Sequence, residues 1–215
     1  TTGLSGGAGT LAFLVGIGSF SVEGFILRQF FLSDHADELG MLTEIAELLD
    51  GCKAVATFNG RSFDIPMLES RFMLNRIQSP FACLQQLDLL PAARRLWRGR
   101  TTGCSLSSLE QEVLGIVRSG DVAGYLIPRV YVQYLQDGVM HGIRRVMDHN
   151  SIDILSMVVL ATRLLETFDQ PWAKGVSGSD CLRVALWLDT NGLSDQAENA
   201  YWAALQRSLT QEERL

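Results

Sequence analysis

The stretch NGRSFD, residues 59–64, decides the fold because it places an acidic residue directly behind an expected strand. The strand is the β-branched and aromatic run at 53–58. Further along, Asp153 lies in the strongly apolar segment 151–168, which predicts a buried helix. A carboxylate at the end of a strand, with another on a helix packed beside it, is how a nuclease gathers oxygen ligands for Mg²⁺. Asp64 and Asp153 are therefore the first candidate site residues.

The hydrophobic pattern around this stretch predicts an α/β protein. We expect strands at 10–20, 24–32, 53–58 and 86–89, and helices at 36–49, 65–76, 106–114, 139–147 and 151–168. A short turn near 21–23 joins the first two strands, so they must run antiparallel. The later alternation of strands and helices predicts a mixed sheet with helices on its faces.

The C-terminal part of the chain has a different pattern. Residues 169–178 are typical of a linker, and 179–208 predict two helices around a turn at 190–193. Small residues recur in both helices, so the pair resembles a single tetratricopeptide-type hairpin. One hairpin cannot form a solenoid, so docking onto the main domain is the simplest role, and a protein partner is another. The expected organisation is a domain at 1–168, a linker at 169–178 and a hairpin at 179–215.

Composition limits the classes of function. The chain has 215 residues, of which 47% are hydrophobic, enough for a sizeable core. Its net charge of −6 argues against a broad electrostatic grip on nucleic acid, although a local basic strip is compatible with it. Four arginines between residues 94 and 100 form either such a phosphate-binding strip or a solvated helix face with ion pairs: Arg94, Arg95, Arg98 and Arg100.

The cysteines and the apolar runs indicate where in the cell the protein is expected to reside. The four cysteines are widely spaced and contain no C-x-x-C pair, which favours free thiols in a reducing cytosol. The apolar run 11–17 is too short to span a bilayer and has no basic leader. We therefore expect a cytoplasmic protein without a membrane partner.

Several motifs occur together in a recognisable order. The sequence resembles the YprB-type ribonuclease H-like domain, in the DEDD exonuclease branch of the ribonuclease H-like superfamily, over about residues 1–165. The resemblance depends on TTGL (1–4), NGRSFD (59–64) with Pro66 and Leu68, LDLL (87–90) followed by ARRLW (93–97), CSL (104–106) with Glu110, and HNSIDILS (149–156).

The resemblance implies a 3′–5′ exonuclease that cleaves single-stranded DNA or RNA with two Mg²⁺ or Mn²⁺ ions. In that family an Asp-x-Glu pair directly precedes Thr-Thr-Gly-Leu and binds both ions, whereas this chain begins at Thr1. We therefore expect the intact protein to be active and this fragment, truncated after its first strand, to be inactive. The alternative is a non-catalytic nucleic-acid-binding or scaffold module.

The resemblance also assigns roles to residues. Asp64 and Asp153 would bind metal, and His149 would position or deprotonate the attacking water. Asp88 would either support the metal ligands without binding the ion itself, or cap the helix that contains Pro91. The residues expected to contact nucleic acid are Thr2, Gly3, Leu4 and Asn59.

Structural alternatives exist for each acidic residue. Asp64 could cap the helix containing Pro66, and His149 with Asn150 could cap the next helix while Asp153 pairs with an arginine. Three residues separate His149 from Asp153, whereas the histidine type of this superfamily usually has four. This departure puts the direct base role of His149 in more doubt than the ligand role of Asp153.

Overall fold

The computed structural model describes residue 1 and residues 10–207, which contacts group into two compact units. Unit 1 contains residues 1–88 and 117–157, and unit 2 contains 89–116 and 158–215. The predicted nucleic-acid contacts Thr2, Gly3 and Leu4 lie outside the described residues. The predicted domain boundaries at 168 and 179 stay a prediction.

Unit 1 begins with an antiparallel hairpin, as predicted. Strand β1 (Leu14–Ser21) pairs with β2 (Gly24–Phe31), in a register that runs from Leu14 opposite Phe31 to Ser21 opposite Gly24. The strand starts later than expected, although residues 11–13 are buried and the Leu32 N–H still donates to the Phe13 carbonyl at 2.8 Å. Residues 11–13 therefore extend β1 as a buried segment, and Phe13 accepts a backbone hydrogen bond of the kind that joins paired strands.

A parallel pair forms the second part of unit 1. Strand β3 (Ala54–Thr57) pairs with β4 (Gln85–Asp88), and α2 (Asp64–Leu74) belongs to the crossover between them. The predicted α/β class and the mixed strand directions are confirmed. In the described part of the chain, however, the strands form two separate two-stranded sheets instead of one continuous sheet.

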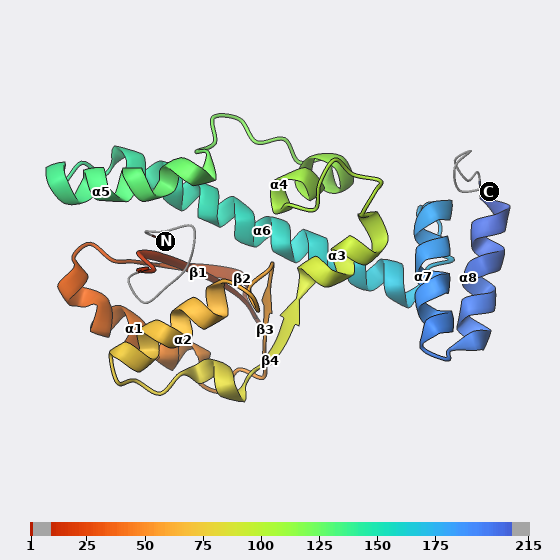
Figure 1. The fold of residues 1–215 in the computed structure, drawn as a ribbon, viewed down its shortest axis with the longest axis horizontal. Helices are drawn as coiled ribbons and strands as arrows, with labels where there is room; N and C mark the ends of the chain where they lie inside the picture. Colours follow the sequence, from red (N-terminus) through yellow and green to blue (C-terminus); the bar gives the residue numbers. More distant parts are fainter. Residues whose placement is uncertain (2–9, 208–215) are drawn as a thin grey trace. The chain divides into compact units, whose positions relative to one another are not determined.

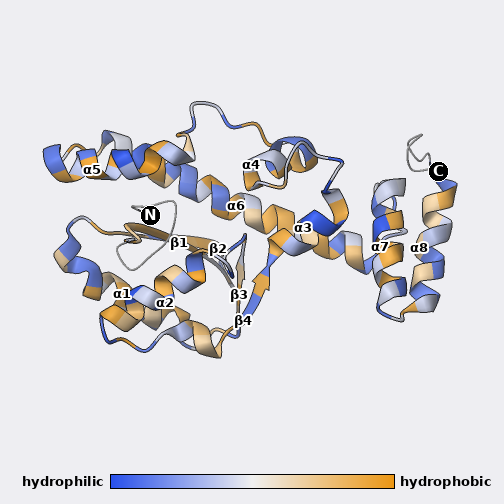
Figure 2. Ribbon diagram, in the orientation of Figure 1, coloured by the Kyte–Doolittle hydropathy of each residue, from blue (hydrophilic) through white to orange (hydrophobic). Residues whose placement is uncertain are grey.

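Helices cover both faces of the β1–β2 hairpin (Figure 1). On one side lies α1 (Glu38–Leu49), which buries an apolar stripe because its hydrophobic residues recur at helical spacing (Figure 2). The fully buried ring of Tyr131, on α5 (Ile127–Asp137), stacks on Phe13 with centroids 4.1 Å apart. Its hydroxyl donates to the Leu32 carbonyl at 3.0 Å, so the phenol is satisfied inside the core.

On the other side of the hairpin lies the first half of α6 (His141–Asp169), a single continuous helix (Figure 1). The prediction of two helices, at 139–147 and 151–168, is wrong. The polar residues around His149 looked like a boundary, but the Gln29 amide donates to the Met147 carbonyl and to Asn150 Oδ1, at 2.8 and 2.9 Å. Polar residues inside the helix are thus satisfied by β2.

Glycine in β1 permits this close packing. A Cβ at Gly16 would collide with the side chains of Asn150 and Ile154, and one at Gly18 would collide with Phe25 and Ile154. The backbone of β1 therefore approaches α6 more closely than a larger residue would allow. The packing fixes the position of the helix turn that carries Asp153.

Unit 2 is helical. Its helices are α3 (Leu89–Trp97), α4 (Leu106–Leu109) with a π-helical turn at Glu110–Leu114, the last part of α6, α7 (Gly178–Thr190) and α8 (Ser194–Gln206). The predicted C-terminal hairpin is confirmed as α7 and α8. Arg100 donates to Asp180 of α7 at 2.6 Å, so this member of the arginine cluster forms an ion pair. Among the described residues, no helix is both long and apolar enough to cross a membrane.

Candidate active site

The loop 59–63 sets the start of α2 and therefore the position of Asp64. Asn59 has a φ of 63°, in the left-handed region that Asn tolerates better than most residues. Gly60 is buried, and a Cβ there would collide with the Thr57 side chain. The Gly60 carbonyl accepts the Ile65 N–H at 2.9 Å, which joins the loop to the new helix. The Asn-Gly pair is thus required by backbone geometry.

Asp88 at the end of β4 holds the same loop. Its Oδ1 accepts the Asn59 N–H at 2.8 Å, and its Oδ2 accepts the Arg61 N–H at 3.3 Å. Thr57 and Asp88 are partners in the β3–β4 register, so the carboxylate lies at the edge from which the loop leaves. Asp88 therefore fixes the loop that leads to Asp64.

Asp64 is the first residue of α2, and Phe63 occupies the N-cap position. The alternative that Asp64 is the helix cap is therefore wrong. Burial raises the pKa of the Asp64 carboxyl, and the negative charges of Asp88 and Asp153 raise it further. Asp64 remains exposed to solvent, and the charges of the Asp88 and Asp153 carboxylates act on it.

Asp153 is a half-buried residue of α6 and contacts an arginine whose side chain is mostly removed from solvent. Arg118 Nη2 donates to Asp153 Oδ1 at 2.6 Å, and Arg118 Nη1 donates to Asp121 Oδ2 at 3.1 Å. The side chain of Arg118 is only 10% exposed, against 32% for Asp153. The alternative that Asp153 pairs with an arginine is thus confirmed. The associated idea that His149 and Asn150 cap a helix is wrong, because both lie inside α6.

His149 lies between two carboxylates. Its Nδ1 is 2.7 Å from Asp121 Oδ1, and its Nε2 is 3.4 Å from Asp153 Oδ2. Burial tends to raise the pKa of Asp121, but hydrogen bonds from His149, Val122 and Arg118 outweigh it and hold that pKa below its usual range. An ionised Asp121 can only accept, so Nδ1 is the donor and Nε2 is the nitrogen on the Asp153 side.

Arg118 and Asp121 were missed in the sequence. They belong to the segment RSGD (118–121), for which no functional role was predicted, and Gly120 there has a φ of 68°. The residues lie about thirty positions before His149 and Asp153, so no periodicity connects them. Chemistry alone could have pointed to Arg118, because a half-buried carboxylate needs a cation and arginine is its usual partner.

The donor chemistry fits a divalent ion in part. Asp64 and Asp153 supply the carboxylate oxygens that Mg²⁺ and Mn²⁺ prefer. Within the described ranges, no three His, Cys, Asp or Glu side chains are placed to hold a metal ion together. These residues therefore offer part of a donor set.

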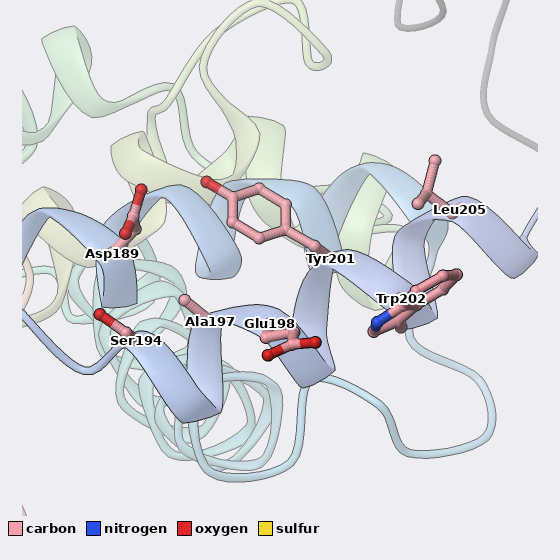
Figure 3. A pocket seen from close by; sticks show the side chains of 7 residues that line it. All are labelled: Asp189, Ser194, Ala197, Glu198, Tyr201, Trp202 and Leu205. Carbon is pink, nitrogen blue, oxygen red and sulfur yellow. The ribbon is translucent and has the colours of Figure 1, made fainter.

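A second hollow lies on the C-terminal hairpin, away from these acids in the sequence. It has a volume of about 200 Å³, and the Tyr201 hydroxyl points toward Asp189 across it (Figure 3). Burial and the negative charge of Asp189 raise the pKa of Tyr201. The lining residues are Asp189, Ser194, Ala197, Glu198, Tyr201, Trp202 and Leu205. Its lining contains no cluster of catalytic groups.

An α/β unit with one carboxylate at the start of the helix after β3, and another on α6 with a histidine one turn away, is typical of the ribonuclease H-like class. A family model described as the RNase_H superfamily matches residues 1–165, and the chain belongs to this superfamily. Members of the superfamily are generally nucleases that use divalent metal ions, which supports an activity on nucleic acid.

A curated relative agrees with this assignment. The chain is 30% identical over 198 residues to "Uncharacterized protein YprB" of Bacillus subtilis (strain 168). The match covers 92% of this chain and 48% of the relative, so the chain spans about half the length of that protein. The resemblance to the YprB-type domain is thereby confirmed. No solved structure matches the chain.

Proposed function

We propose that the protein containing this chain is a metal-dependent 3′–5′ exonuclease of the cytoplasm that hydrolyses single-stranded nucleic acid. Asp64 and Asp153 are two of the carboxylates that hold a pair of Mg²⁺ or Mn²⁺ ions. One observation carries the proposal: in a chain of the RNase_H superfamily, Asp64 begins the helix that follows β3, next to the loop that Asp88 holds, and the pKa of its carboxyl is raised by burial and then by the negative charges of Asp88 and Asp153. Such a cluster is stabilised by a bound cation.

The ions, when bound, lower the pKa of water and neutralise the charge that develops on the phosphate. His149 Nε2 takes the proton from the attacking water, and Asp121 orients the imidazole through Nδ1 at 2.7 Å. The N–H of Asn59 is already bound to Asp88, so Asn59 contacts nucleic acid through its side chain. Thr2, Gly3 and Leu4 contribute the rest of that surface.

The test uses the protein expressed from the full reading frame, with 3′- and 5′-labelled single strands and Mn²⁺. Asp64→Asn and Asp153→Asn should each lower turnover by more than about 10³-fold while the proteins stay folded, because a ligand charge is lost and the shape is kept. Asp148→Asn, which changes an exposed acid on the same helix, is the matched control. Wild-type rates in either test variant, or cleavage that survives chelation, would contradict the proposal.

The histidine is tested separately. His149→Ala should lower turnover by about 10²–10⁴-fold, the usual worth of general base catalysis, with Mn²⁺ affinity nearly unchanged. Asp121→Asn should also lower turnover, because an amide can present its N–H to Nδ1 and favour the wrong tautomer. Unchanged turnover per folded molecule in His149→Ala would restrict His149 to a structural role.

The non-catalytic module is a second candidate, favoured by the ion pair between Arg118 and Asp153. A carboxylate that the protein itself neutralises is less available to a metal ion. Cleavage and binding assays on the protein expressed from the full reading frame separate the two candidates. We expect robust cleavage of single strands with Mn²⁺. Tight binding of single strands without cleavage would support the binding module.

A further inference from the structure

Arg118 is the basic group in contact with the acids of the proposed site. Its guanidinium connects two carboxylates, with Nη2 on Asp153 at 2.6 Å and Nη1 on Asp121 at 3.1 Å. The side chain is 10% exposed, so most of the arginine is removed from water and these two carboxylates help to neutralise its charge. His149 Nδ1 is another neighbour, 3.2 Å from Nη1.

We propose that Arg118 is a built-in counter-cation of Asp153, which a divalent ion displaces from that carboxylate while Asp121 keeps the arginine at the site. This inference rests on the proposed role of Asp153 as a metal ligand. It assigns to Arg118 a role in setting the affinity for the metal ion. It also explains how Asp153 can form an ion pair in this structure and still bind a metal ion.

The permanent charge of arginine is the reason why a divalent ion would displace Arg118 from Asp153. A guanidinium stays protonated at any pH the protein meets, so Arg118 cannot release Asp153 by losing its charge. A dication bound to the same carboxylate would lie within a few ångströms of that positive charge, where like charges repel strongly. In the proposed mechanism, the Nη2 bond to Asp153 therefore breaks when the ion binds.

Asp121 gives the displaced arginine a place to stay. It binds Nη1 independently of Asp153, and its own position is fixed by the Val122 N–H at 2.7 Å. Loss of the bond to Asp153 therefore leaves the guanidinium paired with Asp121, which avoids the large cost of a buried charge without a partner.

The consequence is a threshold for metal binding. An ion must interact with Asp153 more strongly than Arg118 does, a condition that a divalent ion meets more easily than a monovalent one. In the absence of the ion, the arginine neutralises the charge of Asp153.

The experiment measures Mn²⁺ binding to the full-length protein by the electron paramagnetic resonance of free Mn²⁺, without any assay of cleavage. Arg118→Gln should bind Mn²⁺ about tenfold more tightly than the wild type, because the competing charge is gone. Arg144→Gln removes the same charge from an exposed position of α6 and should change the affinity less than about twofold. Arg118→Lys, which loses the bidentate fork, should show a smaller tightening and serves if the glutamine variant does not fold.

Asp153→Asn distinguishes the two ways in which the inference can fail. The variant should weaken Mn²⁺ binding, and in its presence Arg118→Gln should no longer tighten it. If Asp153→Asn leaves the affinity unchanged, or if the wild type binds no Mn²⁺, the proposed function fails at this residue and the inference fails with it. If Asp153→Asn weakens binding but neither Arg118 variant differs from Arg144→Gln, the inference alone is overturned.

Discussion

Gly60 shows how one backbone position determines where a candidate ligand lies. The loop from β3 must turn within a few residues, and it does so with Asn59 at a φ of 63° and Gly60 packed against Thr57. Asp88 then fixes the turn through the Asn59 N–H. The sequence motif was recognisable, but its physical reason became visible only when the space around Gly60 was known.

At this scale we predict opposite effects for one substitution at two glycines. Gly60→Ala should lower the free energy of unfolding by about 2–3 kcal/mol, because the new methyl group has no room beside Thr57. Gly40→Ala, on an exposed position of α1 with open space around it, should raise it by roughly 0.5–1 kcal/mol. Urea denaturation of both variants checks this, and a stable Gly60→Ala protein would mean that the loop relaxes easily.

The difference between the prediction and the structure is also clear at single residues. Asp64, His149 and Asp153 could be selected because their motif order is specific, and the i, i+4 spacing correctly placed the last two on one face. Arg118 and Asp121 could not, because a turn sequence carries no information about which distant carboxylate it will meet. Their roles depend on tertiary contacts.

Among the elements, the hairpin of β1 and β2 and the pair α7 and α8 were predicted because each is defined by neighbours in sequence. Helix α6 was divided in two because the polar residues at 148–150 interrupt its apolar stripe. In the structure, Gln29 on β2 binds that polar stretch. Local pattern therefore fails where a partner from another element satisfies the polar groups.

An ion pair joins α1 to α2. Arg71 donates through Nε to Glu38 Oε1 at 2.6 Å and through Nη2 to Oε2 at 2.5 Å, and Asn75 donates to Oε2 at 2.9 Å. Glu38 is only 6% exposed. Burial tends to raise the pKa of Glu38, but the hydrogen bonds from Arg71 and Asn75 outweigh it and hold that pKa below its usual value.

We predict that Glu38→Gln lowers the free energy of unfolding at pH 7 by about 3 kcal/mol, because Arg71 is left without its counter-charge. A lowered pKa in the folded protein stabilises it above the ordinary pKa of glutamate, and this stabilisation is lost as the pH falls through the folded pKa. The difference between wild type and variant should thus be constant from about pH 6 to 7 and shrink below about pH 4.5. Urea titrations at several pH values test this; a constant difference down to pH 3 would contradict it.

For the whole molecule, the four cysteines report on packing in both units. Cys52 and Cys83 are exposed, Cys104 is half-buried and Cys181 is buried, and all four are free, as the spacing predicted. Burial raises the pKa of Cys181, although Arg207 opposes this, and its thiol donates to the Pro171 carbonyl at 3.0 Å. A thiol that is both buried and protonated is a poor nucleophile.

We therefore predict ordered reactivity toward a thiol reagent such as 5,5′-dithiobis(2-nitrobenzoate). Cys52 and Cys83 should react within seconds to minutes, Cys104 more slowly, and Cys181 only when denaturant is added. Mass spectrometry of the labelled peptides identifies each residue. Rapid labelling of Cys181 in the native protein would show that the contacts around α7 open readily.

The contact between Gln29 and Asn150 has a consequence for the time at which the site appears. The two residues are 121 positions apart in the sequence, and contacts of such long range form slowly because the intervening chain must first be ordered. During synthesis the β1–β2 hairpin leaves the ribosome many seconds before α6, at the usual rate of about 5–20 residues per second. Asp153 can therefore approach Asp64 only after most of the chain has been translated, so shorter nascent chains lack the proposed site.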